Sequence, residues 1–299
     1  MTHISNIQKS AVLVKLGIRQ WGGQKVDKSA TLETCTAKNA DNNAGKFVKS
    51  LMGGSQLLKE IKQVSSAARH ANNAQTLPFT TGVSLLPVTN FERHSELLQG
   101  HQQMFTSLVS EFIDEFEVMR DRQSLRLGEM FNIYDYPSVS ELWTRFQFDL
   151  SYEPLADNNA FDNMLGSVEM EQQLIETANR QMQSRIDDAV TELWSRLTKA
   201  VVHVEDKLRN YKPADGEVKA EGAFRDTLIQ NVRDLCDVLP RLNLTGDADL
   251  DNACQLVSEK IAVYDCEDLR SNDNLRKSVA DDAQSILDTM QGVYGLAAE

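Results

Sequence analysis

Long hydrophobic runs are absent from this 299-residue sequence. Its longest apolar stretches are only a few residues, far below the roughly 20 that a membrane-spanning helix needs. The N-terminal segment "MTHISNIQKS" is polar and lacks the hydrophobic stretch of a secretory signal. With 41% hydrophobic residues, the chain can still bury a sizeable core. The sequence therefore predicts a globular protein that contacts no membrane and stays in the cytoplasm.

Cysteine and histidine are scarce. The four cysteines are Cys35, Cys236, Cys254 and Cys266. They lie too far apart for paired CxxC zinc motifs, and without a secretion signal we expect reduced, mostly buried thiols. Of five histidines, His94 and His101 share a helical face but lie about 10 Å apart along the axis, too far to share an ion. We expect these histidines to be exposed or paired rather than metal ligands.

Common catalytic motifs are also missing. The chain has no GxxxxGK[ST], no strand-borne GxGxxG, no GxSxG and no HExxH. The usual arguments for phosphate-binding loops, serine hydrolases and zinc proteases are therefore absent. We expect a protein that is not an enzyme and needs no cofactor, with an unrecognised, metal-dependent enzyme as the alternative.

The segment "DADLDNACQLVSE" is similar to a calcium-binding loop, with Asp247, Asp249 and Asp251 at the first three ligand positions. Asn252 stands where the loop needs glycine, and Ser258 stands where it needs the bidentate glutamate. We interpret the aspartates as acidic side chains at a helix N-terminus, which the helix dipole stabilises.

A second acidic segment is "SEFIDEFEVMRDR", with Glu111, Asp114, Glu115 and Glu117. No Glu-x-x-His motif accompanies it, so the di-metal bundle pattern is missing. It is interpreted as a solvated helix face, and a mimic of the DNA phosphate row is the other reading.

The net charge of −13 is unevenly distributed. Residues 1–90 contain 11 Lys and Arg against 4 Asp and Glu, whereas residues 91–210 contain 11 against 22 and residues 211–299 contain 9 against 18. The basic first third could form a nucleic-acid surface, or the oppositely charged ends could attract one another in an oligomer. Two differently charged solvated faces would give the same counts.

Under the nucleic-acid hypothesis, lysines and arginines of the first third contact the backbone and a tryptophan stacks on a base. The candidate contacts are Lys15, Arg19, Trp21, Lys25, Lys28, Lys46, Lys49, Lys59 and Lys62. The lysines are well supplied but the aromatic residues are not, because Trp21 is the one aromatic residue among these lysines before Phe47. A role for Trp21 as a core anchor is the stronger interpretation.

Apolar residues spaced three or four apart predict a mainly α protein. The expected helices span about 26–40, 45–52, 56–73, 90–131, 168–210, 223–239, 248–265 and 273–292. Capping boxes at Thr89 with Glu92 and Ser138 with Glu141 mark two helix starts. The very long helix at about 168–210 would extend roughly 60 Å. Its mean apolar step of about 3.8 residues predicts a seam in an elongated helical bundle rather than a left-handed coiled coil.

Strand-like alternation appears in only two places, "AVLVKLGIRQW" and "RFQFDLSYEPL". They predict a small two-stranded β element that pairs residues 11–20 with residues 146–153. The polar joint "YKPADGEVKAEG" is the best candidate boundary. We therefore expect an N-terminal helical body with the β element at 1–211 and an acidic helical region at 223–299.

The connector "AQTLPFTTGVSLLPVTNFERH" has no charged residue before Glu92. Pro78 and Pro87 oppose helix, and Gly82 permits a turn. We predict an ordered strap laid over the helices. The alternative is a partner-docking loop whose candidate residues are Leu77, Phe79, Val83, Leu85 and Leu86.

Four segments together resemble an uncharacterised family of tailed-bacteriophage proteins. They are "LGIRQWGGQKVDK", "AGKFVKSLM", "TLPFTTGVSLLPVTNFE" and "LGEMFNIYDYPSVSELWTRFQFDLSYEPL". The similarity covers about residues 11–156. It implies no activity, cofactor or catalytic residue, but it implies a phage-encoded protein made in the cytoplasm of the host cell.

We therefore expect a non-enzymatic phage protein that acts by protein-protein contacts, including contacts with further copies of itself, in host takeover or anti-defence. A long helix, an apolar connector and oppositely charged ends all suit assembly through surfaces. The alternative is a single-stranded nucleic-acid-binding accessory protein of phage replication or recombination, using the basic first third.

Overall fold

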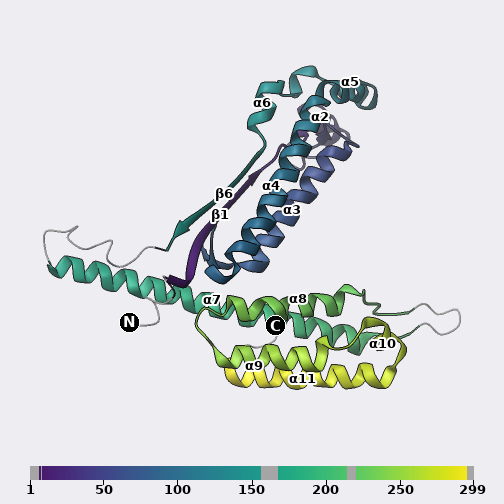
Figure 1. The fold of residues 1–299 in the computed structure, drawn as a ribbon. Helices are drawn as coiled ribbons and strands as arrows, with labels where there is room; N and C mark the ends of the chain where they lie inside the picture. The colour runs from purple at the N-terminus through teal and green to yellow at the C-terminus, as the bar shows by residue number, and fades with distance from the viewer. Residues whose placement is uncertain (1–6, 8, 156–167, 214–219, 295–299) are drawn as a thin grey trace. The chain divides into compact units, whose positions relative to one another are not determined.

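The structure of the chain is a computed structural model that describes residues 7, 9–155, 168–213 and 220–294 (Figure 1). The fold is mostly helical and contains one very long helix, as predicted. Its contacts divide the chain into two compact units. We call residues 1–14, 73–92 and 152–299 the bundle unit, and residues 15–72 and 93–151 the ribbon unit.

These units differ from the expected division into 1–211 and 223–299. Helix α7 (Val168–Asn210) ends just before that boundary and packs against α8 (Thr227–Leu242), which begins just after it. The polar joint therefore connects two helices of one unit. The chain passes between the units elsewhere: within β1 (Ala11–Arg19), near the end of α3 (Gln56–Gln75), within α4 (Phe91–Asp114) and within β6 (Gln147–Pro154).

The ribbon unit is built around α3 and α4, whose buried faces share one hydrophobic cluster. Its smaller elements are β2 (Gln24–Val26), α2 (Lys28–Ala37), β3 (Val48–Ser50), α5 (Phe116–Leu127), the 3-10 turns η2 (Gly128–Met130) and η3 (Ile133–Asp135), and α6 (Val139–Thr144). Aromatic rings dominate the cluster: Trp21 lies 5.7 Å from Phe116 and 6.2 Å from Phe112 between ring centroids. The interpretation of Trp21 as a core anchor is confirmed.

Some helix predictions in this unit are confirmed and one is wrong. Helix α3 and the capping box of α6 at Ser138 and Glu141 are present as predicted. The expected helix at 45–52 is instead strand β3, which pairs antiparallel with β2. The pairing, which local periodicity does not show, satisfies the backbone groups of both segments. The helix expected at 90–131 is divided into α4 and α5.

The β element is larger than predicted. Strands β4 (Leu77–Thr80) and β5 (Val83–Pro87) join β1 and β6 in a four-stranded sheet of order β4-β5-β1-β6. The predicted pairing of β1 with β6 is therefore confirmed, but the prediction that the sheet has only two strands is wrong. β1 pairs antiparallel with β5, with Ala11 opposite Pro87 and Val14 opposite Ser84. The uncharged connector supplies both β4 and β5, because its valine, leucine and phenylalanine side chains suit a half-buried sheet.

Helix α7 is a single helix of 43 residues, as predicted. Its C-terminal half carries a buried row that packs against α8, α9 (Ala248–Val257) and α11 (Asp273–Tyr294). The row consists of Ile186, Ala189, Leu193, Leu197, Val201, Val204 and Leu208. An elongated bundle seam is therefore present in this half of the helix.

The last third of the chain follows the predicted helices with local differences. Helix α9 continues into a π-helical turn over Ser258–Ala262, and a further short helix, α10 (Cys266–Ser271), precedes α11. Pro240 lies inside the last turn of α8, close to its end at Leu242. The core of the bundle unit is almost entirely aliphatic.

Candidate functional site

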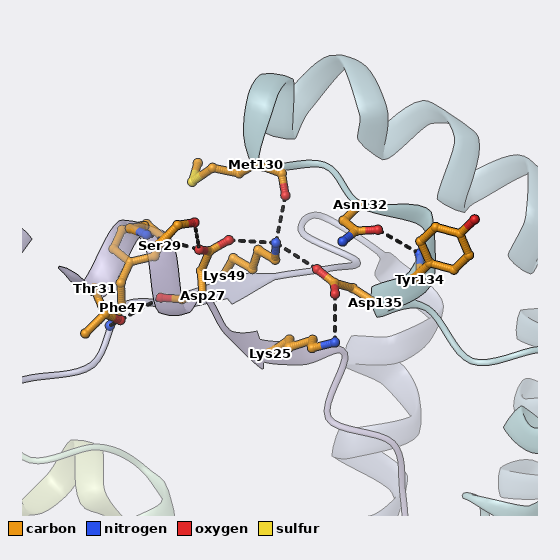
Figure 2. A network of polar contacts seen from close by, with 11 residues as sticks. Lys25, Asp27, Ser29, Thr31, Phe47, Lys49, Met130, Asn132, Tyr134 and Asp135 are labelled. Carbon is orange, nitrogen blue, oxygen red and sulfur yellow. Dashed lines mark hydrogen bonds and ion pairs between the residues drawn. The ribbon is translucent and has the colours of Figure 1, made fainter. Parts of the chain in front are cut away.

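A buried network of charged side chains lies in the ribbon unit (Figure 2). Nζ of Lys49, on β3, lies 2.7 Å from Oδ2 of Asp27 and 2.7 Å from Oδ2 of Asp135. It also donates to the backbone carbonyl of Met130 at 2.7 Å. The side chains of Lys49, Asp27 and Asp135 are 6%, 8% and 9% exposed. The second oxygen of Asp135 accepts from Lys25 at 2.7 Å.

Local structure places each member of this network. Lys25 and Lys49 are opposite each other in the β2-β3 pair, so both side chains project from the same face. Asp27 is the N-cap of α2, where its side chain accepts hydrogen bonds from the Ala30 amide and the Ser29 hydroxyl. Asp135 ends η3, whose N-cap Asn132 accepts from the amide of Tyr134.

A glycine immediately before β2 is required by close packing. Gly23 has a positive φ of 61°, and a Cβ there would lie 2.8 Å from a methyl group of Leu58. Its carbonyl accepts from the Leu51 amide just after β3. A larger side chain at Gly23 would therefore strain the backbone and force Leu58 to move.

The electrostatics keep Lys49, Asp27 and Asp135 charged. Burial alone would lower the pKa of Lys49, but its hydrogen bonds and charge interactions with Asp135 and Asp27 outweigh this effect and raise the pKa. Hydrogen bonds from Lys49, Ser29 and Ala30 hold the pKa of Asp27 far below its usual value. For Asp135, burial raises the pKa, but the hydrogen bonds from Lys25 and Lys49 lower it by more.

The ammonium group of Lys49 has three N–H donors, and three acceptors surround it. A lysine acts as a nucleophile or base only after it loses a proton. The geometry therefore gives Lys49 a structural role, in which it ties β3 to the start of α2 and to residues 130–135.

Exposed apolar side chains lie on the segments that the network joins. We call them the flanking residues: Val26, Leu32, Phe47, Val48, Met130, Ile133 and Tyr134. Tyr134 is 89% exposed, and Val26 and Val48 are opposite each other on the face of the β2-β3 pair away from the lysines. Such residues, held on fixed backbone, are suited to contact another macromolecule.

Only some of the nine candidate nucleic-acid contacts are exposed and able to meet a ligand. Lys49 is buried in the network, Lys25 is paired with Asp135, and Trp21 is only 7% exposed, so it cannot stack on a base. The other six are exposed: Lys15, Arg19, Lys28, Lys46, Lys59 and Lys62. Of these, Lys59 and Lys62 lie on the outer face of α3.

The connector residues divide between core and surface. Leu77, Leu85 and Leu86 are buried, so they cannot serve as an exposed docking loop. Phe79 and Val83 are half-buried. The ordered, covering role of the connector is confirmed, but the covering element is a strand pair in a sheet, because each strand satisfies the backbone groups of the other.

Both acidic segments have the structural roles expected of them. Asp247 is the N-cap of α9, accepts from the amides of Asp249 and Leu250, and accepts from Nε1 of Trp194 at 3.0 Å. The carboxylates of the other segment are exposed along α4 and α5: Glu111, Asp114, Glu115 and Glu117. Among the described residues, no group of three or more His, Cys, Asp or Glu side chains is arranged to hold a metal ion.

The four cysteines are free and buried, as predicted. Burial raises the pKa of Cys254 to about 12 and also raises that of Cys236, so both remain unreactive thiols. His94 is fully buried, with Nε2 3.1 Å from Oδ1 of Asn72, and burial lowers its pKa to about 4. His94 is therefore a neutral, hydrogen-bonded core residue.

Comparison with family models, with curated proteins and with solved structures found no match to this chain. Over the ranges that the structure describes, no helix is both long and apolar enough to cross a membrane.

Sequence reasoning missed Asp27 and Asp135 as partners of Lys49. One signal was present, because Lys49 is enclosed by apolar residues in "FVKSLM", where a lysine is either paired or points away. The identity of its partners was not accessible, since Lys49 lies 22 residues from Asp27 and 81 residues from Met130, with Asp135 farther still.

Proposed function

We propose that the protein works by binding other proteins through the flanking residues of the ribbon unit. We propose further that it does so without catalysis. One observation carries this proposal: the network neutralises its own charges while its segments expose Tyr134, Ile133 and the other flanking residues. Tyrosine is enriched among the few residues that contribute most of the binding energy of a protein interface, and the contacts around such residues exclude water.

The setting is part of the same proposal. Three of the four segments that resemble the phage family contribute the network residues, namely "LGIRQWGGQKVDK", "AGKFVKSLM" and the segment that begins "LGEMF". This resemblance supports our proposal that the protein acts in the cytoplasm of a phage-infected bacterium, with a host or phage protein as its partner.

The test is copurification of the tagged full chain from infected cells, with and without nuclease. Wild type is compared with Ile133→Ser combined with Tyr134→Ser, and with a control, Val263→Ser, which removes an apolar side chain that is 61% exposed on the bundle unit. We expect a protein partner that survives nuclease and is retained by the control but lost from the double variant. A partner retained by all three, or none, would contradict the proposal.

A second function, single-stranded nucleic-acid binding, is favoured by one observation. Among the described residues, Arg19, Lys28, Lys46, Lys59 and Lys62 make no ion pair. Arg69 of α3 donates to the carbonyl of Ile18, so the basic residues of α3 and β1 belong to neighbouring elements.

This alternative predicts affinity for a fluorescent single-stranded oligonucleotide that falls steeply with salt, because bound counterions are released. Reversing Lys59 and Lys62 to glutamate should weaken binding about tenfold or more and reduce the salt slope. Absence of binding at low salt would remove it.

A further inference from the structure

The outer edge of β2 carries backbone groups that point away from its partner strand. Just beyond the paired residues, the amide of Asp27 donates to the carbonyl of Phe47. In an antiparallel pair, residues bonded in this way alternate with residues whose N–H and C=O groups face outward. Counting back from Asp27, the outward-facing residues of β2 are Val26 and Gln24.

The two outer edges of the strand pair differ. On the β3 side, the carbonyl of Ser50 accepts a hydrogen bond from the guanidinium of Arg126, which lies on α5. On the β2 side, no described residue bonds to the outward backbone groups of Gln24 or Val26, and all three residues of β2 are exposed. An exposed strand edge with unpaired backbone groups is a template for a further strand.

The side chains of β2 suit an incoming strand. Val26 is 42% exposed and lies opposite Val48, which is 49% exposed, so the two form an apolar surface beside the edge. A lysine on an edge strand usually discourages pairing. Here the charge of Lys25, on the other face, is balanced by Asp135 at 2.7 Å (Figure 2).

Two lysines lie at the Val26 end of this edge. Lys28 comes two positions after Val26, and Lys46 comes two positions before Val48. Both are exposed, and neither forms an ion pair with a described residue. Outside the network, residues 24–50 contain three lysines and two acids, and neither acid is within six positions of the two valines. The local charge therefore favours a partner that brings carboxylates.

We infer that an extended, acidic segment of the partner protein adds to the open edge of β2 as an antiparallel third strand. This inference rests on the proposed function, because it states how the partner of the flanking residues is bound. Backbone groups of the segment pair with those of Gln24 and Val26, while its apolar side chains cover Val26 and Val48. Its carboxylates reach Lys28 and Lys46.

The backbone groups decide between the possible occupants. A nucleic acid could contact Lys28 and Lys46, but its phosphate oxygens cannot donate to the outward carbonyls of β2, whereas a peptide backbone both donates and accepts. A second copy of β2 would bring Lys25 and no carboxylate. A protein segment with its own acids satisfies both the edge and the lysines.

The test is an NMR titration of the isotope-labelled full chain with a synthetic peptide of about seven residues, within the usual range of strand lengths. Valine alternates with threonine in this peptide, and each end carries aspartate. The amide signals of Gln24 and Val26 should shift and saturate, while the amide of Val263, on the bundle unit, should not move. The same peptide with lysine at both ends should bind about tenfold more weakly or worse.

Two N-methylated peptides test the strand geometry on the wild-type chain. Directly opposite residues of an antiparallel pair share a face, so the valines that cover Val26 are also the residues whose amides point at β2. N-methylation of the valines should weaken binding about tenfold or more, because it removes those hydrogen bonds. N-methylation of the threonines, whose amides point to solvent, should change binding about twofold or less.

Two variants at one position repeat this test from the protein side. Val26→Pro removes an outward N–H without removing a bond of the β2-β3 pair, and it should weaken binding about tenfold or more. Val26→Thr keeps the amide and the branched shape, and it should retain most of the affinity. Lys28→Glu combined with Lys46→Glu should reverse the preference between the two peptides. Circular dichroism checks that each variant is folded.

Three results would overturn the inference: no shift at Gln24 and Val26 with the aspartate peptide, equal binding of the two N-methylated peptides, or shifts at Lys28 and Lys46 that a single-stranded oligonucleotide produces and the peptide does not. Each would leave the copurification result of the proposed function standing. Peptide binding at this edge without any copurified protein would contradict the proposed function and not the strand site.

Discussion

The two units are stabilised by different kinds of interior. The bundle unit buries aliphatic side chains such as Leu193, Leu197 and Val201 along helix seams. Its ion pairs each have at least one exposed partner, including that of the buried Arg276 with Asp273. The ribbon unit buries rings, among them Phe112, and encloses a lysine with two aspartates. The two units therefore differ in where they place paired charges: only the ribbon unit, among the described residues, encloses an ion pair in which both side chains are buried.

The largest effect should follow from breaking the network. Lys49→Met leaves the carboxylates of Asp27 and Asp135 buried with too little positive charge, and we expect a loss of about 3–5 kcal/mol in the free energy of unfolding of the ribbon unit. Hydrogen exchange of β2 and β3 under increasing urea measures it. Lys28→Met, at an exposed lysine, is the control and should change stability by about 0.5 kcal/mol or less.

If Lys49→Met and Lys28→Met lower the free energy of unfolding equally, the buried network does not stabilise the ribbon unit, and the contrast drawn between the two interiors is wrong. A triple variant, Asp27→Asn, Lys49→Met and Asp135→Asn, sharpens the test. It removes all the buried charges together, so we expect it to be less destabilised than Lys49→Met alone.

A smaller effect should appear on acidification, again in the ribbon unit only. Burial lowers the pKa of His94 from 6.5 to about 4. Between these pH values the unfolded chain therefore binds a proton at this side chain and the folded chain does not. Stability from this group is complete above about pH 6.5 and declines as the pH falls towards 4, by about 3 kcal/mol in all.

Urea denaturation of wild type and His94→Gln between these pH values checks this. The difference between the two proteins should shrink as the pH falls, because glutamine does not titrate. If the stability difference between wild type and His94→Gln stays constant across this window, His94 takes up a proton as readily in the folded state as in the unfolded state, which would contradict the prediction.

The smallest effect belongs to the bundle unit. Asp247→Ala removes the N-cap of α9 and the acceptor of the Trp194 indole, and we expect a loss of about 1–2 kcal/mol. Hydrogen exchange of α9 measures it. Asp249→Ala, an exposed position in the same first turn, is the control and should cost only a few tenths of that amount, roughly 0.3 kcal/mol. Equal losses would show that the cap contributes nothing beyond the helix dipole.

The predictions from sequence succeeded where structure depends on neighbours along the chain. The extent of α7, the capping box at Ser138 and the N-terminal acids of α9 all follow from residues within a few turns of one another. Strand β3 was mistaken for a helix because its backbone is satisfied by β2, about 24 residues away, and not by its own neighbours.

The sequence by itself determined the helices, because a repeating apolar face needs only a short stretch of chain to define it. Tertiary structure alone decided which charges are neutralised, since Lys49 meets Asp27 across 22 residues and Met130 across 81. It also decided which apolar residues are covered: the row of α7 from Ile186 onward is buried, while Met170 and Leu174, at helical spacing earlier in the same helix, are exposed. Burial depends on where distant segments come to lie, and the order of residues within one helix does not contain that information.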